Sequence, residues 1–480
     1  MELRDGERRE AAMMRRASEI DTLFASLESG KTVLHVAGLC LFDGELTMDR
    51  LRRHLEPRLH LVPRLRRRLV EVPLGLARPY WADDPGFDIA DHLDEVTLLA
   101  PGDETRLAEL VSRLAEQPLD RGRPLWEAHL IHGLAGGGTA LFVKVHHAII
   151  DGVSAADALA GLLDLGPEPR EAEPAPPWRP APLPGAPEVV ARAAADAAAQ
   201  PFELLAAQAA LVRELPGLVG GPARDLAGAL AGRVRRALAG EPTLAPRTPF
   251  NGVISPHRNL VFRTLPFDDV RRIGKSLDCT VNDAVMALCA GALRRWLAAH
   301  DALPDAPLSA VVPVSTRTAD TRGAEGPRIS AVLGVLPVHL ADPRDRLAAV
   351  RDSMRRAKRT HARVPVGTLV RLLGFAPPAL AALGIRALTA ARWPRFAPPP
   401  FNLIVSNVPG PDFPLYLAGV RMTGYHPFSI LFDGQGLNIT AQSYAGGLHL
   451  GLTCCAELVP DPETLAEHFE EELEVYRAFI

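Results

Sequence analysis

The chain alternates between short apolar runs and longer runs of good helix formers. Residues 124–134 and 139–147 are short and rich in residues that favour strands. Residues 280–300 are long and apolar, and Thr280 and Asp283 at their start have the spacing of a helix capping box. We therefore expect an α/β protein in which strands and helices alternate.

Glycine-rich turns between apolar runs predict two β-hairpins. Residues 135–138 (AGGG) join the runs 124–134 and 139–147, and residues 445–447 (AGG) join 436–444 to 448–455. Four further apolar runs have the length of strands: 260–266, 309–316, 329–340 and 401–410.

Two changes in composition divide the chain into three parts. Residues 166–187 are rich in proline, which fixes φ and removes hydrogen-bond donors, so an extended connector is expected. An alanine- and leucine-rich stretch follows to about residue 240 and has the pattern of interrupted helices. We expect a domain at 1–165, a linker with helices at 166–245 and a domain at 246–480. Each domain should be a mixed or antiparallel sheet flanked by helices.

The overall charge of the chain gives no indication of nucleic-acid binding. Of its 480 residues 47% are hydrophobic and 23% charged, which is ordinary globular composition, and the formal net charge is −4. Basic residues do cluster at Arg64–Leu69 and at Met354–Arg359. Each cluster is either a solvated helix face or a contact for phosphate or anionic lipid.

The cysteines and the apolar runs favour a cytoplasmic location. The five cysteines are scattered without a CxxC pair, which is typical of a reducing compartment. The first residues are charged and lack the apolar core of a secretory signal. No uncharged apolar run reaches the roughly 18 residues of a membrane span. Any membrane association is therefore expected to be peripheral.

The stretch VKVHHAIIDGVS, at 143–154, places adjacent histidines where a strand is expected to end and a helix to follow. Successive side chains of a strand point to opposite faces, so only one of His146 and His147 can face a given cleft. This favours one catalytic and one structural ring over two ligands of one metal, and no HExxH motif or third ligand accompanies them. A pair of core histidines remains the alternative.

A neutral imidazole can accept a proton near neutral pH, as a general base must. Asp151 would then orient the ring or pair with an arginine, and Gly152 would permit positive φ or serve as an ordinary turn residue. The chain has no GxSxG motif and no recognisable cysteine nucleophile. These features favour direct transfer, in which the base activates a hydroxyl or amine of one substrate to attack an acyl group carried by another.

The segment HHAIIDG resembles the HHxxxDG motif of the coenzyme A-dependent acyltransferase superfamily. Further segments, in the same order along nearly the whole chain, resemble the bacterial wax ester synthase/diacylglycerol acyltransferase family. They are PLDRGRPLWEAHLI (118–131), TVNDAVMALCAGALR (280–294), VPVSTR (312–317), SNVPGP (406–411) and LNITAQSYAGGLHLGL (437–452).

This resemblance implies two chloramphenicol acetyltransferase-like domains with mixed sheets and an active site on a tunnel between them. It implies transfer of a long-chain acyl group from acyl-CoA to diacylglycerol, giving triacylglycerol, or to a long-chain alcohol, giving a wax ester. No cofactor is implied, because acyl-CoA is itself a substrate. His147 would be the general base, with His146 supporting it and with Asp151 and Gly152 shaping the loop.

The resemblance also implies residues outside the HHxxxDG segment. Asn282 and Asp283 match an ND pair at a helix start, where free N–H groups could face the CoA or the oxyanion; the alternative is that they only cap the helix. Arg317 is a candidate partner of Asp151 and, with Asp283, Ser406 and Asn407, a candidate for substrate binding. Asp21 lacks the preceding proline that is usual in the family.

The expected partners are acyl-CoA, a lipid alcohol or diacylglycerol, and the surface of a membrane or lipid droplet. Residues 369–396 have the composition of an interfacial segment, although a helix covering the tunnel fits equally well. No nucleic acid is expected, and a homodimer is left open. Two alternatives remain: a related acyltransferase acting on a sugar, polyketide or carrier-bound acceptor, and a non-catalytic lipid-binding homologue.

Overall fold

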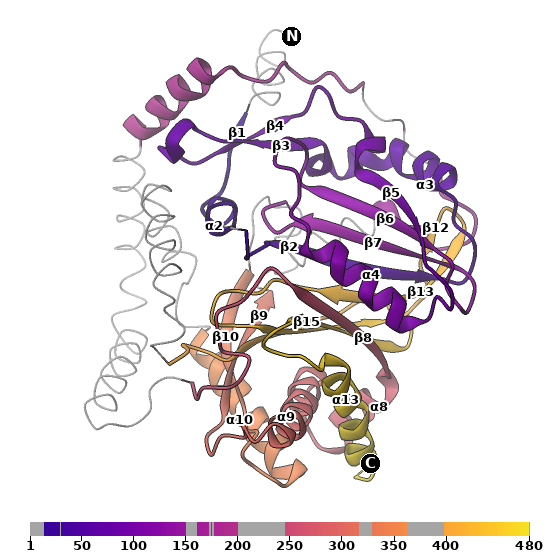
Figure 1. Ribbon diagram of the computed structural model, residues 1–480, viewed down its shortest axis with the longest axis vertical. Helices are drawn as coiled ribbons and strands as arrows, with labels where there is room; N and C mark the ends of the chain where they lie inside the picture. The colour runs from indigo at the N-terminus through magenta and orange to yellow at the C-terminus, as the bar shows by residue number, and fades with distance from the viewer. Residues whose placement is uncertain are drawn as a thin grey trace.

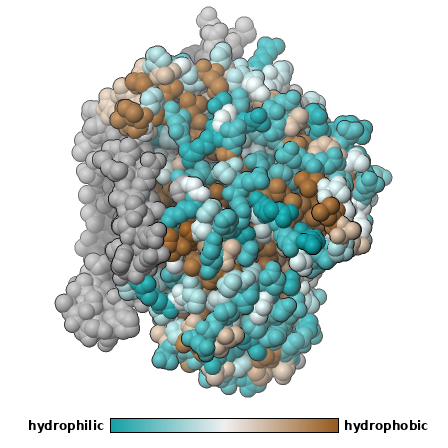
Figure 2. Space-filling model, viewed as in Figure 1, coloured by the Kyte–Doolittle hydropathy of each residue, from teal (hydrophilic) through white to brown (hydrophobic). Residues whose placement is uncertain are grey.

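The computed structural model describes residues 14–28, 30–149, 161–171, 174, 177–199, 245–315, 329–361 and 398–479. These residues form two bodies, each built on a six-stranded mixed sheet, which lie one above the other in Figure 1. The described part of the surface in Figure 2 is mainly hydrophilic, with hydrophobic residues in separate patches. The expected α/β fold with two mixed sheets and flanking helices is confirmed.

The N-terminal body is built on a sheet with the strand order β12-β13-β2-β7-β6-β5. Neighbouring strands are antiparallel, except that β5 and β6 run parallel. The predicted hairpin at 124–147 is confirmed as β6 and β7. The strands are β2 (His35–Phe42), β5 (Leu93–Thr97), β6 (Trp126–His132), β7 (Thr139–His146), β12 (Tyr416–Leu417) and β13 (Val420–Phe428).

The C-terminal body is built on a sheet with the order β10-β9-β11-β14-β15-β8. Strand β11 runs parallel to both β9 and β14, and the other pairs are antiparallel. The second predicted hairpin is confirmed as β14 and β15. The strands are β8 (Arg258–Pro266), β9 (Leu308–Ser315), β10 (Ile329–Leu336), β11 (Leu403–Val408), β14 (Leu437–Tyr444) and β15 (Gly447–Cys455).

Strands β12 and β13 leave the C-terminal part of the chain and complete the N-terminal sheet. Strand β13 pairs with β2, and the register places Tyr425 opposite Cys40 and Phe428 opposite Ala37. Strand β13 also packs against β14 and β15 of the other sheet. The two bodies are therefore tied together by the backbone itself.

One face of the C-terminal sheet is covered by helices. Helix α9 (Val281–Ala299) lies in this layer, which Figure 1 shows on the side away from the N-terminal body, together with α8 (Phe267–Ser276), α10 (Pro343–His361) and α13 (Pro462–Arg477). Leu288, Leu293 and Trp296 of α9 are at most 1% exposed and form the centre of this core. The predicted capping box is confirmed, because Asp283 N donates to Thr280 Oγ1 over 3.1 Å and Thr280 N donates to Asp283 Oδ2 over 2.9 Å.

Helix α4 (Glu104–Glu116) fills the junction between the bodies. Its apolar face, including Leu110 and Val111, packs with Leu39 of β2 and Leu260 of β8 in one core. Its polar groups occupy the free edge of β8, where Ser112 Oγ accepts from Leu260 N over 2.8 Å. An edge strand is thereby covered.

The remaining elements belong to the N-terminal body. A small sheet has the order β1-β4-β3, and α2 leads directly into the region before β2 (Figure 1). The bounds are β1 (Arg15–Arg16), α2 (Glu19–Leu27), α3 (Met48–Leu55), η1 (Glu56–Leu61), η2 (Pro63–Arg66), β3 (Arg67–Val70), η3 (Pro73–Gly75), β4 (Tyr80–Asp83) and η4 (Ile89–His92).

Candidate active site

The two adjacent histidines lie at the end of β7, where their backbone is held from both sides. His146 is the last residue of the strand and lies opposite His35 of β2. His146 N donates to Leu125 O over 2.9 Å, and His147 N donates to Leu34 O over 2.9 Å. The segments before β6 and β2 therefore fix the point at which the loop after the histidines begins.

His146 is buried and has its tautomer set by the loop. Its side chain is 1% exposed, and its Nδ1 accepts from Ala148 N over 3.1 Å, so a neutral ring carries its proton on Nε2. Nε2 has no hydrogen-bond partner among the described residues; Glu28 Oε2 lies 3.8 Å away. Burial, followed by the charges of Arg121 and His147, lowers the pKa of His146 to about 3. The ring is therefore uncharged at neutral pH.

His147 occupies a different environment. It is only partly buried, and its ring stacks on that of Phe24 from α2, with centroids 4.2 Å apart and planes inclined by 22°. The structure thus gives the two histidines the unequal surroundings that strand alternation predicts, with one inside the body and one nearer its surface.

Arg64 holds the loop that follows the histidines. Its Nη1 donates to Ile149 O over 3.1 Å and lies 3.5 Å from Ala148 O. Both Ala148 and Ile149 are 1% exposed, so their carbonyl groups depend on donors from the protein. The arginine fixes the backbone directly after His147.

The basic run Arg64–Leu69 is therefore not a solvated helix face, which corrects that expectation from the sequence. It lies on η2 and β3, and Arg64, Arg66 and Arg67 have partners within the protein. The guanidinium of Arg66 lies 3.9 Å over the ring of Trp178, and Arg67 Nε bonds Asp83 Oδ1 over 2.9 Å. The sequence pattern could not show these partners, because a cluster of arginines has the same spacing whether its side chains face solvent or bind groups within the protein.

A small pocket lies between the two sheets near the histidines. It is lined by Val33, His35, Ala37, Ala115, Arg258, Leu260, 428–431 and Thr453. His35 is 6% exposed, and its Nδ1 is buried with no hydrogen-bond partner among the described residues. Burial, followed by the charge of Lys144, lowers the pKa of His35 to about 3. The pocket wall next to His146 therefore offers a neutral imidazole whose Nδ1 has no hydrogen-bond partner among the described residues.

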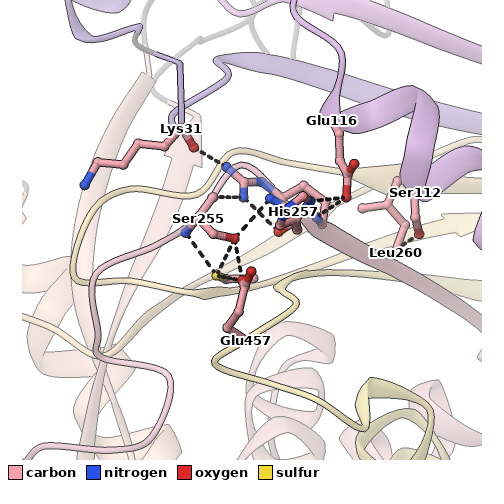
Figure 3. A network of polar contacts seen from close by, with 9 residues as sticks. Lys31, Ser112, Glu116, Ser255, His257, Leu260 and Glu457 are labelled. Carbon is pink, nitrogen blue, oxygen red and sulfur yellow. Dashed lines mark hydrogen bonds and ion pairs between the residues drawn. The ribbon is translucent and has the colours of Figure 1, made fainter.

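Arg258 lines this pocket and joins the two bodies. Figure 3 shows the polar network at this place, with Lys31, Glu116 and Ser255 labelled. Arg258 donates through its guanidinium to Ser255 O over 2.5 Å and His257 O over 3.0 Å, and it reaches across to Lys31 O over 2.6 Å. Its backbone N donates to Glu116 Oε1 of α4 over 2.9 Å. The loop before β2 is thereby fastened to the C-terminal sheet.

Asn282 and Asp283 lie in the first turn of α9. The carboxylate of Asp283 is 4% exposed and accepts from Thr280 N and from Thr280 Oγ1, so it is occupied as a cap. Asn282 differs, because its Nδ2 is buried without a hydrogen-bond partner among the described residues. Helix α9 packs against α8, α10, α13, β10 and β11 of the C-terminal body.

Ser406 and Asn407 lie on β11 and face opposite sides of the sheet. Leu403 and Val405 pack in the core under α9, so Asn407 shares their face, and Ser406 lies on the other face with its register partner Thr440 of β14. Only Ser406 of this pair is on the face turned from the helix layer. Asp151, Gly152, Arg317 and the segment 369–396 lie outside the described residues.

Several residues at the site were missed in the sequence. Phe24, Glu28 and His35 surround the histidines but are far from them in the chain, and Arg258 lies beyond the linker. Only Arg64 was noticed, as part of a basic cluster. The sequence next to the histidines contains no pattern that indicates which distant residues will contact them.

Family models and solved structures agree with this architecture. Residues 17–285 match the model of the wax ester synthase/diacylglycerol acyltransferase catalytic domain, and residues 325–477 match that of the WS/DGAT C-terminal domain. A probable diacylglycerol O-acyltransferase of Mycobacterium tuberculosis is 36% identical, over 94% of this chain and 96% of its own length.

Two solved structures show the same fold. The wax ester synthase/diacylglycerol acyltransferase from Marinobacter aquaeolei superposes with a TM-score of 0.66 at 27% identity, covering 96% of this chain and 98% of that one. The first condensation domain of the calcium-dependent antibiotic synthetase has a TM-score of 0.56 at 17% identity, covering 97% and 96%. At that identity the second likeness concerns the fold alone.

Proposed function

The chain belongs to the wax ester synthase/diacylglycerol acyltransferase family and is an acyl-CoA-dependent O-acyltransferase, and on that premise we propose that it acylates diacylglycerol or a long-chain alcohol directly, with His147 as general base. The observation that carries the mechanism is the unequal pair at the end of β7. His146 is buried and neutral, whereas His147 is partly exposed beside it.

The reaction balances without a covalent enzyme intermediate. His147 takes the proton of the acceptor hydroxyl, and the hydroxyl oxygen attacks the thioester carbon of acyl-CoA. The tetrahedral oxyanion then collapses, the carbon–sulfur bond breaks, and the proton passes from His147 to the departing CoA thiolate. A positioned base contributes roughly 10²–10⁴-fold. The product is an ester, triacylglycerol or wax ester according to the acceptor.

The neighbouring groups support this assignment by holding the base. His146 keeps the loop in place through the bond from Ala148 N to its Nδ1, and Arg64 holds Ile149 O. In the proposal Asp151 and Gly152 complete the geometry of this loop, with Arg317 as the partner of Asp151. A base held at the end of a strand keeps its position and orientation better than one on a loop without such contacts.

The remaining polar candidates would act on acyl-CoA or the oxyanion. Asn282 is the best of them, because its amide Nδ2 has no described partner and can donate. Asp283 would contribute by fixing that first turn, since its carboxylate is used as a cap. Ser406 remains a candidate contact for substrate, and Asn407 a weaker one because it shares the face of the helix core.

Both acceptors dissolve in lipid, so the proposal includes peripheral contact with a membrane or lipid droplet. No helix among the described residues has the length and hydropathy needed to cross a bilayer. Leu74 and Leu76, in and next to η3, are 86% and 65% exposed, as side chains that touch lipid would be. An apolar channel would favour long acyl chains by about 0.8 kcal/mol per buried methylene.

The test is CoA release from palmitoyl-CoA by the purified protein with hexadecanol, with a diacylglycerol or with no acceptor, and with the ester identified by mass spectrometry. We expect release to depend on an acceptor. His147→Ala should lower kcat by roughly 10²–10⁴-fold while palmitoyl-CoA still binds in calorimetry.

His257→Ala is the matched control, because the side chain of His257 is 60% exposed and does not line the pocket. It should retain full turnover. If His147→Ala kept wild-type turnover, the proposed mechanism would be wrong. An absence of release with either acceptor would move the function to a sugar, polyketide or carrier-bound acceptor, or to lipid binding without catalysis.

A further inference from the structure

Helix α2 is fixed at its N-terminal end by three separate contacts. Ser18 and Asp21 form a capping box, with Asp21 N donating to Ser18 Oγ over 3.0 Å. Asp21 is 4% exposed and also accepts from Trp81 Nε1 over 3.2 Å. Arg78 Nη1 bonds Glu19 Oε1 over 2.6 Å. This end of the helix is therefore bound to β4 and to the segment before it.

The C-terminal end of α2 is held by one arginine. Arg121 donates to Glu28 Oε2 from Nε over 3.1 Å and from Nη2 over 2.9 Å, and Nη2 also donates to Ala25 O over 2.6 Å. Its Nη1 bonds Glu71 Oε1 over 2.5 Å. The side chain of Glu28 is 10% exposed, so the pair is largely shielded from solvent on the carboxylate side. A fork of this kind fixes direction as well as distance.

Phe24 of this helix and Glu28, its C-cap residue, lie next to the two histidines. Phe24 stacks on His147 at 4.2 Å between centroids. Glu28, at the C-cap four residues later, has Oε2 3.8 Å from His146 Nε2. Nε2 carries the proton of the neutral ring, because Nδ1 accepts from Ala148 N. The helix thus presents a flat apolar face to one ring and a carboxylate to the N–H of the other.

We infer that α2 is the positioning element of the histidine pair, with Phe24 setting the plane of His147 and Glu28, held by Arg121, setting the direction of the His146 N–H. The inference rests on the proposed role of His147 in acyl transfer. Neither residue touches the reacting atoms. Their effect is on orientation, which a base must keep to within about 10–20° of the productive geometry.

The first test compares substitutions at Phe24. Phe24→Leu keeps an apolar side chain but removes the flat face, so kcat should fall about 10–100-fold with KM for palmitoyl-CoA within about twofold. Phe24→Tyr restores an aromatic ring and should recover most of kcat. Leu23→Ala is the matched control: Leu23 adjoins Phe24 but is 45% exposed, and its variant should behave as the wild type.

The second test compares the two glutamates that pair with Arg121. Glu28→Gln and Glu71→Gln each remove an ion pair of Arg121, but only Glu28 faces His146. Glu28→Gln should lower kcat about tenfold without changing KM, and Glu71→Gln should leave both within about twofold. Equal losses in the two variants would show that Arg121 only stabilises the fold and would overturn the inference. So would an unchanged kcat in both Phe24→Leu and Glu28→Gln.

A chemical readout separates this inference from the proposed reaction. Diethyl pyrocarbonate modifies accessible imidazoles, and the modification of His147 can be followed by peptide mass spectrometry whether or not the protein transfers acyl groups. We expect His147 to react several-fold faster in Phe24→Leu than in the wild type, Phe24→Tyr or Leu23→Ala. Equal rates would refute the packing of Phe24 on His147, whereas faster modification in a protein with no acyl transfer would refute only the proposed function.

Discussion

Acidification should unfold this protein through histidines that are buried in the uncharged form. Burial is the main cause that lowers the pKa of four buried histidines from 6.5, to about 3 for three of them and to about 4 for the fourth. They are His35, His146, His426 and His449. His426 and His449 lie edge to face between β13 and β15, with centroids 5.0 Å apart, at the junction of the two bodies.

The magnitude follows from proton binding. Below pH 6.5 the unfolded chain protonates these histidines while the folded protein does not, so acid favours unfolding. The stability they contribute is therefore complete above about pH 6.5 and is lost as pH falls toward the folded values. Each histidine loses about 1.4 kcal/mol per pH unit. From about pH 7 to about pH 5 this is roughly 2 kcal/mol each and roughly 8 kcal/mol for four, comparable to the whole stability of an ordinary domain.

The assay is urea unfolding at several pH values between about 7 and 5, for the wild type and His426→Gln. The glutamine can still donate to Leu450 O, which lies 3.2 Å from His426 Nδ1. The variant should have a smaller slope of unfolding free energy against pH, by about 1.4 kcal/mol per unit. His257→Gln, at an exposed histidine, controls for the substitution itself. An identical slope in the wild type and His426→Gln, or a stability that does not fall with acid, would refute the reasoning.

Two further predictions concern single contacts. Arg64→Met removes the donor to Ile149 O, and we expect kcat to fall about tenfold with an unchanged KM. Arg106→Met, at a 54% exposed arginine of α4, is the control and should have no effect. Equal activity in the two variants would contradict the role of Arg64. Gly291→Ala would place a Cβ 2.0 Å from the carboxyl carbon of Glu472, which is buried and paired with Arg346. Urea unfolding should therefore show a free energy of unfolding lower by at least about 3 kcal/mol. A decrease below about 1 kcal/mol would contradict this packing.

Local elements could be predicted because their information is local. The two hairpins follow from apolar runs on either side of glycine turns, and Gly137 and Gly446 indeed have φ of 74° and 85°. The start of α9 follows from the spacing of Thr280 and Asp283. The unequal surroundings of His146 and His147 follow from the alternation of side chains along a strand. None of these requires knowledge of distant segments.

The contacts around the site could not be predicted, because they join segments far apart in the chain. Phe24 lies more than a hundred residues before His147, and the pocket wall combines β2 with β8 and β15. The basic run at 64–69 is the sharpest case, since its charges indicated solvent or anions, yet Arg64 binds carbonyl groups of the loop after His147. Nothing within a run of arginines specifies its partner.

The sequence by itself determined eight strands of the two large sheets, both hairpins, the start of α9 and the place of the histidine pair, because propensity, turn chemistry and side-chain alternation act over a few residues. The tertiary structure alone decided that β12 and β13 cross into the other sheet, and that Arg258 bonds Lys31 across the bodies. It also decided that α2 presents Phe24 and Glu28 to the two rings. Buried backbone and charged groups need hydrogen-bond or ion-pair partners, and many of these partners come within reach only once the two sheets have packed together.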